Sequence, residues 1–244
     1  FKVDVNTEEI YIFYNTYFKK ITYANFQRYV NLICDTYGVE LKSAKIIEDI
    51  CKYILKDYRI AIHSVKNDRQ YIAFKDKILN LESMIAYIGT PNVFLTWCLN
   101  CNYDDVFNKG IALPYPNNFC KFLDEIADRD PELIARLWEA IGLLLSNDVS
   151  SKKIILFQGI GNSGKSKLAE FIISLMSENA VTELTFSDLN EKFALSGIPG
   201  KHMICSMDIP SQAISDQAAS KLKSISSGGT DKISVEPKYQ NRYD

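Results

Sequence analysis

A glycine-rich segment in the second half of the chain limits the fold more strongly than any other feature of the sequence. It follows a continuous apolar run, Ile154–Phe157, which is typical of a strand in a parallel sheet covered on both faces. It precedes a stretch whose apolar residues recur at helical spacing. A strand, a glycine-rich loop and a helix in this order predict the opening of an α/β domain with a mainly parallel sheet. The apolar residues of the expected helix are Leu168, Phe171, Ile172, Leu175 and Met176.

The segment from Gly159 to Ser166 matches the phosphate-loop pattern G-x-x-x-x-G-K-[ST] in full. Its glycines allow the backbone N–H groups to turn toward a phosphate, and the start of the helix adds its positive dipole end. Lys165 is expected to reach the β- and γ-phosphates and to act in catalysis, and Ser166 to help hold Mg²⁺. The sequence therefore predicts ATP and Mg²⁺ as ligands, and the alternative is a loop that binds no phosphate. The expected contact residues are Gly159, Gly161, Asn162, Ser163, Gly164, Lys165 and Ser166.

A second apolar run, Met203–Asp208, ends in an acidic residue. A carboxylate at the end of such a strand can lie beside Mg²⁺ and the attacking water in a phosphate-loop enzyme. Asp208 is therefore the candidate for a catalytic and metal-binding carboxylate. The alternative is an ordinary surface aspartate at a strand end.

The last part of the sequence predicts a helix and then a hairpin. Ser211 or Ser215 can cap a helix with apolar residues on one face, and this helix is expected to end at Gly228-Gly229. Polar and apolar residues alternate over Lys232–Glu236, as in one strand of a hairpin. Lys232 and Lys238 flank this strand and are candidates for contacts with DNA, or are ordinary surface charges.

The first half of the chain predicts helices and short strands rather than a nucleotide-binding loop. Residues 7–60 are rich in helical periodicity, and Ile46, Ile47, Ile50, Cys51, Ile54 and Leu55 form one apolar stripe. Residues 69–116 predict short strands and loops, with runs at Tyr71–Phe74, Ile78–Leu81 and Val93–Trp97. Two helices follow, the second with Asp130 as N-cap and Pro131 as first helical residue.

A polar stretch, Ser146–Ser151, separates these helices from the phosphate-loop segment. We place a domain boundary there. Residues 1–148 are then expected to form a mainly helical (α+β) domain, and residues 149–244 a phosphate-loop ATPase domain.

Composition excludes some classes of function. The net charge of -2 removes the simple argument from a strongly basic chain to nucleic acid. No apolar run approaches the roughly 18–20 residues that cross a bilayer, and the start, Phe1–Asp4, lacks an initiator Met and a signal peptide. We therefore expect a cytoplasmic protein whose sequence begins inside a longer polypeptide. Cys98 and Cys101 form the single C-x-x-C pair, but few further ligands are available for zinc.

Together these segments resemble the superfamily 3 helicases, in particular the poxvirus-type and the phage or plasmid primase-helicases. The matching segments, which run from about residue 65 to 240, are Tyr71–Leu81, Gly159–Ser166, Leu189–Leu195, Gly200–Asp208 and Lys221–Tyr239. The resemblance implies an AAA+ ATPase that forms a ring, commonly a hexamer, around single-stranded or forked DNA and unwinds it. It also places Lys232 and Lys238 in the hairpin region that lines the ring. The chain ends at Asp244, before the sensor residue and arginine finger of this family, so we expect the ATPase domain to be incomplete at its C-terminus.

Two other functions are compatible with a phosphate loop. A kinase would need a lid with several arginines, whereas Arg242 is the only arginine after Arg136. An ATP-switched regulator that binds or loads DNA, with little unwinding activity, stays open as the alternative. We identify no primase active site in this chain.

Overall fold

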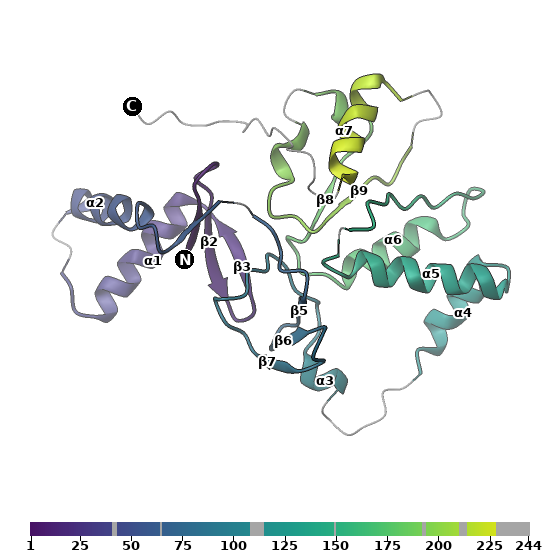
Figure 1. The fold of residues 1–244 in the computed structure, drawn as a ribbon, viewed down its shortest axis with the longest axis horizontal. Helices are drawn as coiled ribbons and strands as arrows, with labels where there is room; N and C mark the ends of the chain where they lie inside the picture. The colour runs from purple at the N-terminus through teal and green to yellow at the C-terminus, as the bar shows by residue number, and fades with distance from the viewer. Residues whose placement is uncertain are drawn as a thin grey trace.

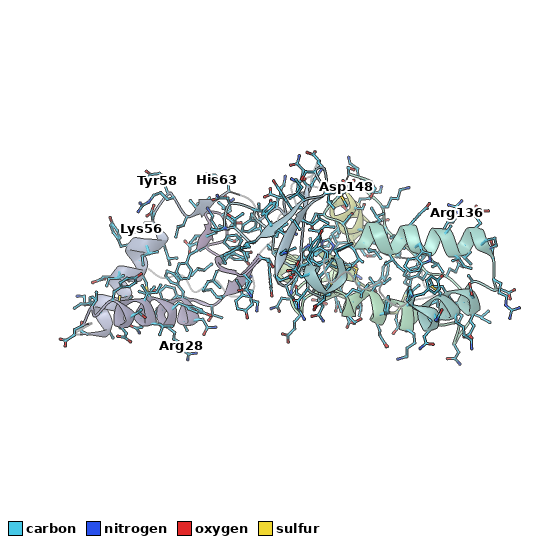
Figure 2. All side chains as sticks on the ribbon, turned by 90° about the horizontal axis from the view of Figure 1, so that it is seen from below. Arg28, Lys56, Tyr58, His63, Arg136 and Asp148 are labelled. Carbon is cyan, nitrogen blue, oxygen red and sulfur yellow. The ribbon has the colours of Figure 1, made fainter. Side chains whose placement is uncertain are left out.

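In the computed structural model the chain is a mixed α/β protein, and its described residues form three small sheets (Figure 1). Helices α1 and α2 lie at one end of the molecule, α4, α5 and α6 at the other, and strands β5, β6 and β7 between them. Arg136 lies toward the α5 end, Asp148 nearer the middle of the molecule, and Arg28, Lys56, Tyr58 and His63 on the opposite side (Figure 2). The residues that the structure describes are 1–40, 43–63, 65–107, 115–148, 150–191, 194–209 and 214–227. Within this part of the chain, no helix combines the length and the apolar character needed to cross a membrane.

The N-terminal sheet has the strand order β3-β2-β1-β4. Strands β1 and β4 are parallel and the other pairs are antiparallel, with Ile10 opposite Ile21 in the β2–β3 hairpin. The helical prediction is wrong for this hairpin, because aromatic and β-branched residues such as Ile10 and Phe13 fit a pleated surface better than a helix. The strands are β1 (Lys2–Asp4), β2 (Ile10–Tyr14), β3 (Tyr17–Ile21) and β4 (Ala61–Ile62).

Two helices, α1 (Tyr23–Thr36) and α2 (Ala44–Leu55), follow the hairpin. Each begins at a side-chain cap: the Thr22 hydroxyl accepts from the Asn25 N–H, and the Ser43 hydroxyl from the Ile46 N–H. The predicted apolar stripe of α2 is confirmed apart from Ile46, which is exposed. The cluster that it joins contains Ile10, Phe26, Val30 and Cys51, with Ile47, Ile50, Ile54 and Leu55 packed against them.

A three-stranded antiparallel meander, β5-β6-β7, forms the middle of the molecule. Two of the predicted apolar runs are strands here, whereas Val93–Trp97 is buried without forming a strand. This run is instead held by side chains and single backbone bonds, such as the one from the Phe18 N–H to the Leu95 carbonyl at 2.6 Å. The elements are β5 (Tyr71–Ala73), β6 (Lys77–Asn80), β7 (Ala86–Ile88) and the short helix α3 (Tyr103–Phe107).

The largest apolar core joins α4 (Asn117–Ile126) and α5 (Pro131–Leu144) to α6 (Lys165–Ser174). The predicted cap of α5 is confirmed, because the Asp130 carboxylate accepts from the Glu132 and Leu133 N–H groups. The buried members of this core are Trp97, Leu123, Ala127, Leu137, Ile141, Leu168, Ile172, Met176 and Ala180.

This core contains residues from both sides of the predicted boundary between residues 148 and 149. The apolar faces of α4 and α5 are buried against residues of α6. Asn147, in the polar stretch that suggested the boundary, is itself buried. The boundary therefore does not separate two cores, and limited proteolysis is the test of whether residues 1–148 fold independently.

The last described elements form a small layer of their own. Strands β8 (Val181–Glu183) and β9 (Met203–Cys205) are parallel, with Thr182 opposite Ile204. Helix α7 (Asp216–Ser226) has Ser215 as its N-cap, one of the two serines that the sequence offered for this role. Ala218 on α7 joins Leu189 and Leu195 in an apolar cluster. Those two residues lie on the 3₁₀ turns η1 (Asp188–Asn190) and η2 (Ala194–Gly197).

Candidate nucleotide-binding site

The glycine-rich segment folds as a turn that leads directly into α6. Gly164 is the N-cap of this helix, in the left-handed backbone conformation at φ +85°, and no side chain caps the helix. Lys165 and Ser166 are therefore the first two helical residues. The N–H groups of a helix's first turn have no carbonyl partner within the helix and attract anions. The predicted combination of loop and helix N-terminus is present in the fold.

The Lys165 ammonium lies over the inner side of this turn. Its Nζ donates to the Gly159 carbonyl at 3.1 Å, to the Ile160 carbonyl at 2.7 Å and to the Ser163 hydroxyl at 3.1 Å. An ammonium has three donors, so these three contacts use its full capacity. All the acceptors are neutral, and a phosphate oxygen at the same place would compete with them as a charged partner.

Gly164 is required by packing as well as by its backbone conformation. A Cβ at this position would lie 2.7 Å from Ile126 Cγ2 and 3.2 Å from Phe122 Cε2, both on α4. A Cβ at Gly159 would lie 3.1 Å from the Ser163 hydroxyl, whereas a Cβ at Gly161 would meet nothing within 4 Å. Asn162, at φ 60°, is one of the residue types that tolerate the left-handed conformation.

Helix α6 is fixed by the core beneath it. Leu168 and Ile172 are almost completely buried, and the Phe171 ring stacks on Phe119 of α4 with centroids 4.2 Å apart. This packing fixes the N-terminus of α6 relative to α4 and α5. A binding site for phosphate is more precise when it is built on such rigid elements.

The predicted strand before the loop is not formed in the structure. Residues 153–159 make no backbone-to-backbone hydrogen bond to any described part of the chain, and Ile154 and Leu156 are each 61% exposed. The apolar run has the composition of a buried strand, but a strand also needs a neighbour to pair with, and the described residues supply none. Among the described residues, β8 and β9 form a two-stranded parallel sheet, and the other parallel pair, β1 and β4, belongs to the N-terminal sheet.

Asp208 lies three residues beyond the end of β9, and its side chain is exposed. The Ser206 hydroxyl donates to the Asp208 carbonyl at 3.2 Å, which shapes the backbone after the strand. Among the described residues, no hydrogen bond or ion pair joins the Asp208 carboxylate to Lys165 or Ser166. The structure thus confirms a strand at Met203–Cys205, and the metal role of Asp208 with Ser166 stays a prediction.

The other predicted site residues are placed as follows. Lys232 and Lys238 lie outside the described residues. Cys98 is buried and Cys101 exposed, and burial raises the pKa of the Cys98 thiol to about 11. No cluster of three or more His, Cys, Asp or Glu side chains suited to a metal occurs in the part of the chain that the structure describes.

Comparison with protein families gives a match within the second half of the chain. The model of a family described as "Family of unknown function (DUF5906)" matches residues 157–244. The matched segment contains the loop, α6, both parallel strands and Asp208. The candidate site therefore lies within a sequence pattern that this family shares.

Proposed function

We propose that the chain binds ATP with Mg²⁺ at Gly159–Ser166 and is the motor part of an ATP-dependent DNA helicase of the phage- or plasmid-type replication proteins. The observation that carries the nucleotide site is the Lys165 ammonium, held over the loop at the start of α6 by two carbonyls and one hydroxyl. The helicase part of the proposal, with its AAA+ fold and hexameric ring, rests on the order of motifs along the sequence.

The position of the Lys165 ammonium and the uncapped start of α6 support a triphosphate as the ligand. Lys165 can exchange its neutral carbonyl partners for phosphate oxygens with little movement, because its Nζ already lies within the turn. The first N–H groups of α6 orient the phosphate chain, and Ser166 presents its hydroxyl from the first turn of the helix. Mg²⁺, when bound, would neutralise charge on the phosphates, and Asp208 is the carboxylate proposed to orient it with Ser166.

The test of the nucleotide site compares two lysines of the same helix. Lys165→Ala removes the loop ammonium, and Lys167→Ala removes an exposed ammonium that pairs with Glu170, at 2.7 Å. We expect calorimetry with ATP and Mg²⁺ to give at least about a tenfold weaker affinity for the first variant, since a hydrogen bond to a charged group is worth about 1.5–3 kcal/mol. Lys167→Ala should bind ATP with the same affinity as the wild type. Equal affinity in all three proteins would refute the site.

The helicase activity needs a separate experiment on the longer parent protein. ATP hydrolysis and strand displacement are measured with and without single-stranded DNA, in the wild type and in Asp208→Asn. We expect DNA to stimulate hydrolysis, and the variant to bind ATP but to lose most hydrolysis and unwinding. ATP hydrolysis that does not respond to DNA, without strand displacement, would favour the ATP-switched regulator instead.

A further inference from the structure

Helix α1 carries two rows of apolar residues, and the fold buries only one of them. Phe26 and Val30 are buried in the N-terminal core. Tyr29, Leu32 and Ile33 recur at the i, i+3 and i+4 spacing of one helix face and are exposed, by 40%, 61% and 46%. Single exposed apolar residues are ordinary, whereas neighbouring ones on one face mark a contact surface. We call these three residues the α1 stripe.

The α1 stripe is open to a partner of the size of a protein. Thr36 lies one turn beyond Leu32, and its hydroxyl donates to the Leu32 carbonyl at 2.7 Å, so its polar atom already has a partner within the helix. Helices α1 and α2 lie at one end of the molecule, away from α4, α5 and α6 (Figure 1). Because the stripe is exposed, a partner can cover it without displacing another described element.

Two opposite charges flank the stripe on one side of the helix. Arg28 and Asp35 are seven residues, or two turns, apart, which separates them by about 10 Å along the axis. Leu32 lies four residues after the first and three before the second, so both are its neighbours on the helix surface. Both are exposed, and the Arg28 Nη1 donates to the neutral Asn25 side-chain oxygen at 3.3 Å. Among the described residues, neither charge has an ion-pair partner.

The order of these charges is self-complementary in an antiparallel pair of helices. A two-fold axis that passes beside Leu32, perpendicular to α1, places Arg28 of each copy opposite Asp35 of the other. Such a contact forms every pair twice, because each copy uses the same surface. Leu32, close to the midpoint between the charges, then packs on Leu32 of the second copy. A parallel pairing would instead set each charge against its like, which disfavours it.

We infer that the α1 stripe is a contact between two copies of this chain, formed by antiparallel α1 helices and closed by two ion pairs between Arg28 and Asp35. Few side chains per copy take part, compared with roughly 20–30 residues a side in a standard interface. We therefore expect a dissociation constant of about 10–100 μM. The inference goes beyond the proposed function, because a two-fold contact can join two subunits or two rings but does not by itself build a ring.

The test is sedimentation equilibrium of the chain over about 5–300 μM, without nucleotide or DNA. The wild type should show a monomer–dimer equilibrium. Leu32→Asp brings two carboxylates together at the axis and removes two apolar side chains, so association should weaken at least about thirtyfold. The matched control is Ile88→Asp on β7, at an aliphatic residue that is 81% exposed, and it should dimerise as the wild type does. Thermal melting checks that each variant is folded.

Charge reversal tests the antiparallel order. Arg28→Asp and Asp35→Arg each convert both ion pairs into contacts between like charges, so either variant alone should dimerise at least about tenfold more weakly than the wild type. In an equimolar mixture the two introduced charges face each other, and the native Asp35 of one copy faces the native Arg28 of the other. The mixture should therefore dimerise with nearly wild-type affinity. Lys121→Asp, on α4, is the control for charge reversal elsewhere.

Three results would overturn the inference: a wild type that stays monomeric over this range, dimerisation that Leu32→Asp does not weaken, or a mixture that associates no better than its single variants. The nucleotide site is tested separately, because Lys165 is unchanged in all these proteins. Absence of ATP binding together with dimerisation through the α1 stripe would refute the proposed function alone.

Discussion

The imidazole of His202 stacks on the indole of Trp97, with ring centroids 3.9 Å apart and an angle of 24° between the planes. The His202 Nε2 also lies 2.7 Å from the Leu144 carbonyl, at the C-terminal end of α5. His202 immediately precedes β9, so this one side chain joins the parallel pair to the core beneath α6. Burial lowers the pKa of His202 to about 4, with a smaller opposing effect from the bond to Leu144.

The burial of His202 should make the unfolding free energy depend on pH. The unfolded chain binds a proton at His202 near pH 6.5, and the folded protein only near pH 4, so the unfolded state holds more protons between these values. The contribution of neutral His202 to the unfolding free energy is therefore fully present above pH 6.5, and it decreases as the pH falls toward 4. We expect a loss of about 2–3 kcal/mol in unfolding free energy between pH 7.5 and 4.5, at 1.36 kcal/mol per pH unit. Urea denaturation at a series of pH values measures it.

The variant His202→Phe isolates this contribution. Phe keeps a ring against Trp97 but leaves the Leu144 carbonyl without its partner, which costs about 1 kcal/mol at pH 7.5. At pH 4.5 the variant should equal or exceed the wild type in stability. His63→Phe, at the exposed second histidine, is the control and should keep the wild-type pH dependence. An unchanged pH profile in His202→Phe would contradict the argument.

Asn147 is a second buried link across the same region. Its Oδ1 accepts from the Trp97 Nε1 at 2.8 Å, and its Nδ2 donates to the Tyr71 carbonyl at 2.7 Å. Asn147→Ala leaves both partners without a hydrogen bond, and we expect a loss of about 2–4 kcal/mol in unfolding free energy. Asn100→Ala removes a single exposed amide contact with the Ser174 carbonyl and should change stability by less than about 0.5 kcal/mol. A similar loss in unfolding free energy for both variants would show that the buried hydrogen bonds of Asn147 do not stabilise the fold more than an exposed contact does.

The capping residues and glycines in the sequence predict where several helices begin. Asp130 before Pro131 and the glycine-rich turn before α6 lie where the sequence predicts, and Ser215 before α7 is one of the two caps that it offered. A cap or a glycine turn is decided by hydrogen bonds within a few residues, so the sequence alone carries the information.

The parts of the fold that the sequence does not predict depend on residues far apart in the chain. Ile154–Phe157 has a strand's composition, but pairing needs a partner strand that no local pattern reveals. The polar stretch around Asn147 suggested a linker, whereas Trp97 and Tyr71 make it part of the core.

Gly164 should be the least replaceable glycine of the loop. Gly164→Ala combines a left-handed backbone with a Cβ that overlaps Ile126, and we expect a loss of about 2–4 kcal/mol in unfolding free energy. Gly161→Ala meets no neighbour and should be neutral or stabilising by up to about 1 kcal/mol, because it restricts the unfolded chain. Urea denaturation of both variants distinguishes these outcomes. Equal destabilisation would mean that the contact with α4 does not constrain the loop.

Cleavage between the two halves of the chain should not separate them. Lys152 and Lys153 are exposed in a segment without regular secondary structure, so trypsin is expected to cut there first. Lys121 is equally exposed but lies within α4, and it should resist cleavage, which makes it an internal control. The core that joins α4, α5 and α6 is not cut by this reaction. We therefore expect the two products to elute together from a gel-filtration column in native buffer and to separate only in denaturant. Two products that elute separately, each with a cooperative melting transition, would instead establish residues 1–148 as an independent domain.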